Sequence, residues 1–158
     1  MSGTAVKSPV TGATDAQRVR NLLRAYEAWL KVDLCYQNFE TELVELLTWY
    51  GPPGGGLWLA HVDDGPAGCV AARPLKPGEA EMKRLWVEPH ARGTGLGQRL
   101  AETAVAFARG AGYRVMRLDT MPGRMGPANT LYRRLGFVET PAYYDTPIEE
   151  SIFLALDL

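Results

Sequence analysis

The sequence predicts one mixed α/β domain, in which a mostly antiparallel sheet is flanked by helices. Its 158 residues suit a single hydrophobic core, and 46% hydrophobic with 22% charged residues is typical of a globular protein. Helical and strand-like stretches alternate, and two strand-like stretches are joined by a compact turn that favours an antiparallel hairpin. We therefore expect residues 1–158 to form one domain, with residues 1–14 as a loosely ordered N-terminal segment.

Two helices are predicted before the first strand. Residues 14–17 have the form of a capping box, and apolar residues then recur at helical spacing as far as Leu30. A second amphipathic stretch covers residues 39–50, behind Asn38. It ends at residues 51–56, whose glycines and prolines predict a loop.

Three strands are predicted next. Residues 57–62 and 67–73 form the hairpin, joined by the turn Asp-Asp-Gly-Pro. Residues 80–87 form a third strand, in which Met82 lies on one side by parity and Leu85 on the other. This change of parity predicts a β-bulge between them.

The remaining elements alternate between helix and strand. A helical stripe starts at residue 95 and continues to residue 110, followed by a strand over residues 115–119. A short helix is predicted over residues 127–135, with proline at its start and Gly136 just past its end. Alternating apolar residues predict a final strand over 152–158.

Composition argues against several classes of partner. The formal net charge of −1 gives no overall positive field to hold a nucleic acid or an anionic membrane. Cys35 and Cys69 lack the spacing of zinc ligands, so no metal is expected. No apolar run approaches the ~20 residues of a membrane span. We expect a cytoplasmic protein.

The glycine-rich segment at residues 92–97, Arg-Gly-Thr-Gly-Leu-Gly, predicts an anion site. It follows a strand and leads into a helix, so its amides and the positive helix N-terminus suit a phosphate. A dinucleotide fingerprint starting at Gly93 requires glycine where the chain has Gln98, and no Gly-Lys-Ser/Thr follows for a Walker loop. Both of these phosphate-binding patterns are therefore excluded.

Arg92, Gly95 and Gly97 match an Arg-x-x-Gly-x-Gly pattern that resembles the acetyl-coenzyme A motif of the GNAT family of N-acetyltransferases. A second stretch, residues 128–137, is similar to the short helix of this family that carries Leu-Tyr followed by Gly-Phe. The resemblance covers about residues 15–158. It implies a GNAT-like sheet with a splayed strand pair.

The resemblance also implies acetyl-CoA as co-substrate, with its pantetheine arm in the splay as an extra strand. A backbone N–H near Val87 would bind the thioester carbonyl and stabilise the developing oxyanion. The residues expected to bind the cofactor are Leu85, Trp86, Val87, Arg92, Gly93, Thr94, Gly95, Leu96, Gly97 and Gln98. The side chain of Arg92 would approach a phosphate or brace the turn.

Two catalytic roles follow from the resemblance. Tyr132 would be the general acid that protonates the leaving thiolate, although its helical spacing also suits core packing. Glu81 would be the base that deprotonates the amine, with pairing to a neighbouring cation as the structural alternative. Glu88, Asp119 and a water relay remain alternatives for the base.

The acceptor is expected to be a small-molecule amine or a peptide N-terminus. Aromatic residues near the expected acceptor pocket are Trp49, Tyr50, Tyr143 and Tyr144. The sequence leaves open a catalytically silent acyl-CoA-binding sensor, as well as transfer of a longer acyl group. A homodimer is a further expectation, because residues 151–158 would form an exposed strand edge.

Overall fold

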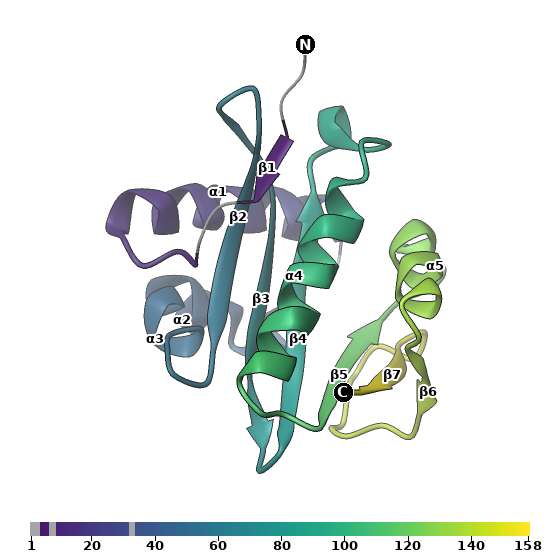
Figure 1. The fold of residues 1–158 in the computed structure, drawn as a ribbon. Coiled ribbons are helices and arrows are strands. Elements are labelled where there is room, and N and C mark those ends of the chain that lie inside the picture. The colour runs from purple at the N-terminus through teal and green to yellow at the C-terminus, as the bar shows by residue number, and fades with distance from the viewer. Residues whose placement is uncertain (1–3, 7–8, 32–33) are drawn as a thin grey trace.

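The computed structural model describes residues 4–6, 9–31 and 34–158. Its strands are β1 (Thr4–Val6), β2 (Gly56–Val62), β3 (Gly65–Lys76), β4 (Glu79–Val87), β5 (Val115–Thr120), β6 (Val138–Thr140) and β7 (Ile152–Asp157). They form one sheet in the order β1-β2-β3-β4-β5-β7-β6 (Figure 1). All neighbouring strands are antiparallel except β4 and β5, which are parallel. The predicted mixed, mostly antiparallel sheet is confirmed.

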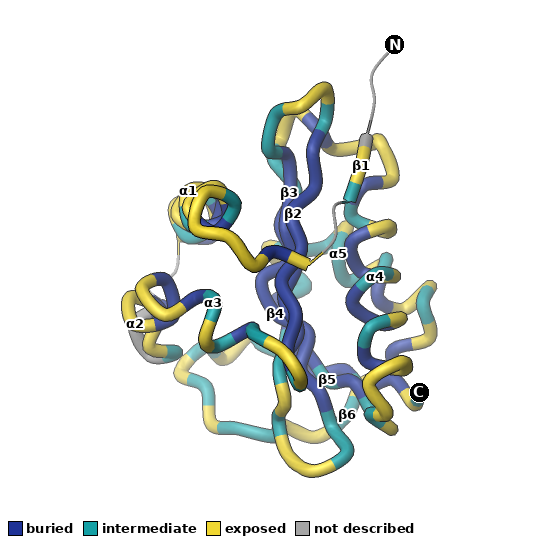
Figure 2. The backbone as a smooth tube through the Cα atoms, turned by 60° about the vertical axis from the view of Figure 1, so that its left-hand side comes forward, coloured by how far each residue is buried: buried dark blue, intermediate teal, exposed yellow. Residues whose placement is uncertain are grey.

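Helices cover both faces of this sheet. They are α1 (Ala13–Leu30), α2 (Phe39–Val44), α3 (Leu46–Trp49), α4 (Leu96–Gly110) and α5 (Gly126–Arg134), with 3-10 turns η1 (Leu34–Gln37) and η2 (Pro89–Ala91). Figure 2 shows α1, α2 and α3 on one side of the sheet and α4 on the other. None of the described helices is long and apolar enough to cross a membrane.

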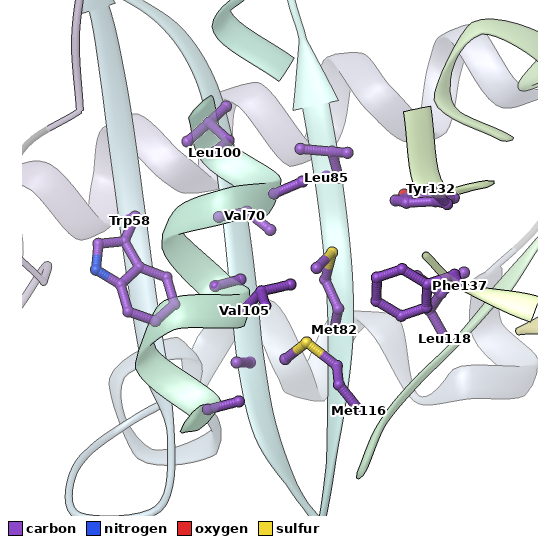
Figure 3. Close-up of a cluster of buried hydrophobic side chains, with 14 of the residues drawn as sticks. Trp58, Val70, Met82, Leu85, Leu100, Val105, Met116, Leu118, Tyr132 and Phe137 are labelled. Atoms are coloured by element: carbon purple, nitrogen blue, oxygen red, sulfur yellow. The ribbon is translucent and has the colours of Figure 1, made fainter. Parts of the chain in front are cut away.

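The sheet separates two hydrophobic clusters. On the α4 face, Leu100 packs with strand residues such as Val70 and Met82, and the cluster continues to Tyr132 and Phe137 (Figure 3). On the α1 face, residues of α1 and α2 pack against the other side of β2, β3 and β4. Strands β2 to β4 are buried on both faces, which explains the apolar sequence of β2 and of the centre of β3. In contrast, β4 contains three buried charged residues, Glu81, Lys83 and Arg84.

Strands β4 and β5 diverge after three residue pairs. Residues 79–81 pair with residues 115–117, and no pairing continues from Met82 or Leu118 onward in the described structure. The edge of β4 that faces β5 therefore carries backbone groups without a neighbouring strand. This is the splayed strand pair that the resemblance predicted.

The predicted bulge lies next to this divergence. The register between β3 and β4 shifts opposite Arg84 and Leu85, and Arg84 has a left-handed φ of 62°. Glu42 of α2 holds the Arg84 guanidinium through two hydrogen bonds, of 2.7 and 2.9 Å. This buried ion pair fixes the bulge against the α1 face.

Some predicted helix boundaries are wrong. Helix α1 starts at Ala13 behind Gly12 without a side-chain cap, so the predicted capping box does not form. The predicted helix over residues 39–50 is interrupted at Glu45, whose φ of −102° and ψ of 28° divide it into α2 and α3.

The two ends of the chain also differ from expectation. Residues 4–6, expected to be loosely ordered, form β1 and pair with β2, whereas residues 1–3 and 7–8 lie outside the described structure. The final strand β7 lies between β5 and β6, so its central residues 153–155 are paired on both sides and do not form a free edge. A homodimer stays a prediction, but residues 153–155 do not offer the exposed strand edge on which that prediction is based.

Candidate active site

The glycine turn connects η2 to α4 and is open to a ligand. Gly93 and Gly95 have φ values of 80° and 81°, a conformation that side chains other than glycine rarely adopt. A Cβ atom at either glycine would meet nothing within 4 Å. Glycine is therefore required by the backbone conformation, and the space beside the turn is free.

The amides of this turn are available for an anion. Arg99 makes the first backbone bond of α4, from its N–H to the carbonyl of Gly95 at 3.1 Å. The amides of residues 93–98 precede it and have no backbone acceptor in the described part of the chain. Together with the helix N-terminus they form an anion-binding arrangement.

Arg92 braces this turn. Its Nε donates to the carbonyl of Val87 at 3.2 Å. Its guanidinium carbon lies 5.1 Å from the ring of Trp29 and 5.1 Å from that of Trp86. The side chain thus connects the turn to β4 and to the end of α1 through cation–π contacts.

A cavity of about 530 Å³ extends beside the turn. It is lined by every residue expected to bind the cofactor except Thr94, whose hydroxyl donates to the carbonyl of Ala91 at 2.6 Å. Arg92, Arg124 and Arg134 line the cavity, and its described lining contains no acidic residue. Its charge therefore suits a polyphosphate.

Sequence reasoning missed the other walls of this cavity. Tyr26 and Trp29 come from α1, and Pro127, Ala128 and Leu131 come from α5. These residues line the cavity because α1 and α5 pack beside the diverging strands β4 and β5. The amphipathic spacing of each helix predicts only which of its faces is buried, not what that face packs against.

The open edge of β4 faces this cavity. Glu88 donates its N–H to the carbonyl of Ala67 on β3, at 2.8 Å. Because successive N–H groups of a strand point to opposite sides, the N–H of Val87 points away from β3, toward the splay. This is the orientation expected of an oxyanion donor at that position.

A second, smaller cavity of about 30 Å³ lies between the diverging strands. It is lined by Tyr26, Leu34, Gln37, Met82, Lys83, Arg84, Leu85, Asp119, Met121, Met125 and Tyr132. Tyr26, Leu85 and Met125 line both cavities, so the two adjoin.

Tyr132 contacts the smaller cavity from α5. Its side chain is only 4% exposed and packs edge-on against Phe137 (Figure 3). Burial raises the pKa of the Tyr132 hydroxyl, and the charge of Asp119 contributes in the same direction. The hydroxyl therefore remains protonated at neutral pH, as a proton donor must.

The structure does not bring Glu81 together with Tyr132 at either cavity. Glu81 is 1% exposed and accepts hydrogen bonds from Arg73 Nε at 2.9 Å and from the hydroxyl of Tyr143 at 2.7 Å. Both of its oxygens are therefore used by a structural ion pair and a tyrosine. The cation is Arg73, which lies opposite Glu81 on β3.

Of the two other carboxylates considered as the base, Asp119 lines the smaller cavity and Glu88 lines neither. Asp119 lies near the end of β5, where its Oδ2 accepts a hydrogen bond from the hydroxyl of Tyr144 at 2.8 Å. Its other oxygen makes no hydrogen bond in the described structure.

The aromatic residues expected near the acceptor line neither cavity. The Tyr50 hydroxyl donates to Glu42 at 2.7 Å, and Trp49 Nε1 donates to Glu45 at 3.1 Å. Tyr143 and Tyr144 lie behind the carboxylates of Glu81 and Asp119. They position acidic groups rather than form the cavity wall.

The two histidines also lie outside the described cavities. His61 is buried in β2, and His90 is exposed in η2. Within residues 4–6, 9–31 and 34–158, no group of three or more His, Cys, Asp or Glu side chains is placed to hold a metal ion.

Comparison with known proteins agrees with this geometry. The model of the acetyltransferase (GNAT) family matches residues 17–137. An uncharacterized N-acetyltransferase of Schizosaccharomyces pombe is 37% identical over 100% of this chain and 95% of its own length.

Solved structures share the fold at low sequence identity. A GNAT-family acetyltransferase from Staphylococcus aureus superposes with a TM-score of 0.80 at 15% identity, covering 98% of this chain and 99% of that one. An N-acetyltransferase from Thermoplasma acidophilum, in complex with coenzyme A, gives a TM-score of 0.73 at 13% identity, with 99% of both chains covered. From the family match and the full-length relative, the chain belongs to the acetyltransferase (GNAT) family and is an N-acetyltransferase.

Proposed function

We propose that this protein transfers the acetyl group of acetyl-CoA directly to a primary amine. The observation that carries the proposal is the pair of adjoining cavities. The larger one combines the amide-rich glycine turn with three arginines, and the smaller one contains Tyr132 and Asp119. A cavity suited to a polyphosphate donor thus adjoins one whose residues would transfer protons.

The larger cavity fits coenzyme A in its charge and in its backbone groups. The pyrophosphate would bind the amides of residues 93–98 at the N-terminus of α4. The amide groups of the pantetheine arm would pair with the open edge of β4 as an added strand. The complex of the Thermoplasma acidophilum neighbour with coenzyme A supports the same choice of ligand.

Direct transfer requires a neutral amine. An amine of pKa ~10 is protonated at pH 7, and removing its proton costs about 4 kcal/mol. Asp119 would accept this proton, directly or through a water molecule, because Asp119 is the carboxylate that lines the smaller cavity. Glu81 becomes the less favoured base, since Arg73 and Tyr143 use its oxygens.

The acyl transfer then needs two further groups. The amine nitrogen bonds to the thioester carbon, and the N–H of Val87 stabilises the negative charge that develops on the carbonyl oxygen. As the C–S bond breaks, the sulfur takes a proton from the hydroxyl of Tyr132. The nitrogen, now bonded to the carbonyl carbon, loses its second proton through solvent, and the Tyr132 oxygen regains one. No side-chain nucleophile takes part.

The proposal is tested by release of the coenzyme A thiol in the presence of acetyl-CoA and a panel of primary amines. We expect release that depends on both substrates, together with an N-acetylated product identified by mass spectrometry. Tight binding of acetyl-CoA without turnover of any amine would favour the acyl-CoA sensor. Competition with longer acyl-CoA donors tests the acyl preference, for which Met82 and Met121 line the smaller cavity.

A further inference from the structure

Lys83 is a buried cation without a full set of acceptors. Its side chain lies on β4 and is 8% exposed, and its single hydrogen bond, to Gln37 Oε1, has a length of 3.4 Å. No carboxylate of the described residues lies within 4 Å of its Nζ. Because an ammonium carries three donors and is rarely buried unless paired, this arrangement lacks an anion.

The neighbouring carboxylates are already engaged. Glu81 accepts from Arg73 and Tyr143, and one oxygen of Asp119 accepts from Tyr144. The adjacent cation Arg84 has its own partner in Glu42. Burial lowers the pKa of Lys83, and the charge of Arg84 adds to this effect. The charges of Glu81 and Asp119 act in the opposite direction but do not cancel it, so the pKa stays below its usual value. A bound anion beside Nζ would offset this cost.

Lys83 lines the smaller cavity together with Asp119 and Tyr132. Arg84 also lines this cavity, but Glu42 neutralises its guanidinium. Among the described residues, Lys83 and Asp119 are therefore the cation and the carboxylate without an ion-pair partner there, and their charged atoms are more than 4 Å apart because they form no ion pair. The charges of a small zwitterion match this pattern, with its carboxylate at Lys83 and its amine at Asp119. Because the smaller cavity of about 30 Å³ has room for about two water molecules, the rest of the zwitterion would extend into the adjoining larger cavity.

We propose that the acceptor is a free α-amino acid, whose carboxylate binds Lys83 while its amine lies toward Asp119 and Tyr132. This inference rests on the proposed acetyl transfer and chooses between the two kinds of acceptor that the sequence left open. A peptide N-terminus carries a neutral amide where the amino acid carries its carboxylate, so it would leave Lys83 without its anion.

The test compares L-amino acids with their primary amides, which keep the side chain and the amine but lose the negative charge. Thiol release gives kcat/KM for each pair, and calorimetry gives binding of the same ligands to the coenzyme A-bound protein, without turnover. We expect each acid to exceed its amide by about 10-fold or more, as for other charge-assisted hydrogen bonds.

Variants assign this preference to Lys83. Lys83→Met should raise KM for the acids by about 10-fold and leave the amides unchanged, and Lys83→Arg should restore part of the preference. Lys76→Met is the matched control, because Lys76 is an exposed lysine at the end of β3 that lines neither cavity. Thermal unfolding verifies that each variant is folded.

The outcomes separate this inference from the proposed function. Amides used or bound as well as acids, or a preference that Lys83→Met retains, would overturn the amino acid assignment while acetyl transfer stands. The same holds if amines without a carboxylate are the only acceptors. Absence of acetyl-CoA binding and of turnover in the folded wild type would overturn both.

Discussion

At the scale of single residues, the hydroxyl of Tyr132 distinguishes catalysis from packing. Tyr132→Phe keeps the ring against Phe137 and removes only the proton donor. We expect kcat to fall by about 100-fold, the contribution typical of a general acid, with acetyl-CoA affinity unchanged. Steady-state kinetics and calorimetry measure the two effects.

The control for this variant is Tyr113→Phe. Tyr113 donates its hydroxyl to the carbonyl of Gly54 at 2.7 Å and lines neither cavity. Its removal should leave kcat unchanged. Equal kcat values for wild type and Tyr132→Phe would assign Tyr132 to core packing alone.

The identity of the base is the second prediction at this scale. Asp119→Asn should lower kcat/KM by about 100-fold, because the amide cannot accept the proton of the amine. Glu81→Gln should lower the unfolding temperature, because Arg73 loses its charged partner, but leave kcat/KM unchanged. The opposite pattern in the same assay would return the role to Glu81.

At the scale of elements, the ion pair between α2 and β4 holds the bulge beside the candidate active site. Glu42 and Arg84 are both buried, and the Tyr50 hydroxyl also donates to Glu42. Glu42→Gln leaves the Arg84 charge buried and uncompensated, so we expect a loss of about 3–5 kcal/mol in the free energy of unfolding. Denaturant titration at pH 7 measures this loss.

The same pair predicts a pH dependence of stability. Burial alone would raise the pKa of Glu42, but the hydrogen bonds and charge of Arg84, together with the Tyr50 hydroxyl and the charge of Lys83, outweigh it and lower the pKa below its usual value. The stabilisation is therefore complete above the pKa of the unfolded state and is lost as the pH falls through that of the folded state. The free energies of unfolding of the wild type and of Glu42→Gln should therefore become more similar as the pH falls.

Glu40→Gln is the matched control, since Glu40 forms an exposed ion pair with Arg24. Exposed pairs of this kind contribute little, so its unfolding curve should superpose on that of the wild type. A stability change as large as that of Glu42→Gln would contradict the role of burial.

At the scale of the whole molecule, the elements with strong periodicity could be predicted from the sequence. The helical stripes of α1 and α4 and the change of parity in β4 were local signals, and each appears in the structure. Strand β1 could not be predicted, because three residues become a strand only by pairing with β2, more than fifty residues away. The two-sided pairing of β7 likewise depends on long-range topology.

The same division holds for the site. The glycine turn could be predicted because positive φ and close approach of a ligand restrict the residue type, whatever the packing. The family resemblance implies Glu81 as the base, but the environment of Glu81 comes from Arg73 on β3 and Tyr143 in the loop before β7. The importance of Lys83 depends on burial and on the charges around it, which spacing does not reveal.

The measurement that tests the central claim most directly is calorimetric titration of acetyl-CoA into the wild type and into Gly95→Glu. The variant places an anion beside the turn amides, and Gly110→Glu places the same charge at the other end of α4. We predict a dissociation constant on the order of micromolar for the wild type and for Gly110→Glu, and lost binding in folded Gly95→Glu. Absent binding in the wild type, or undiminished binding in Gly95→Glu, would contradict the account.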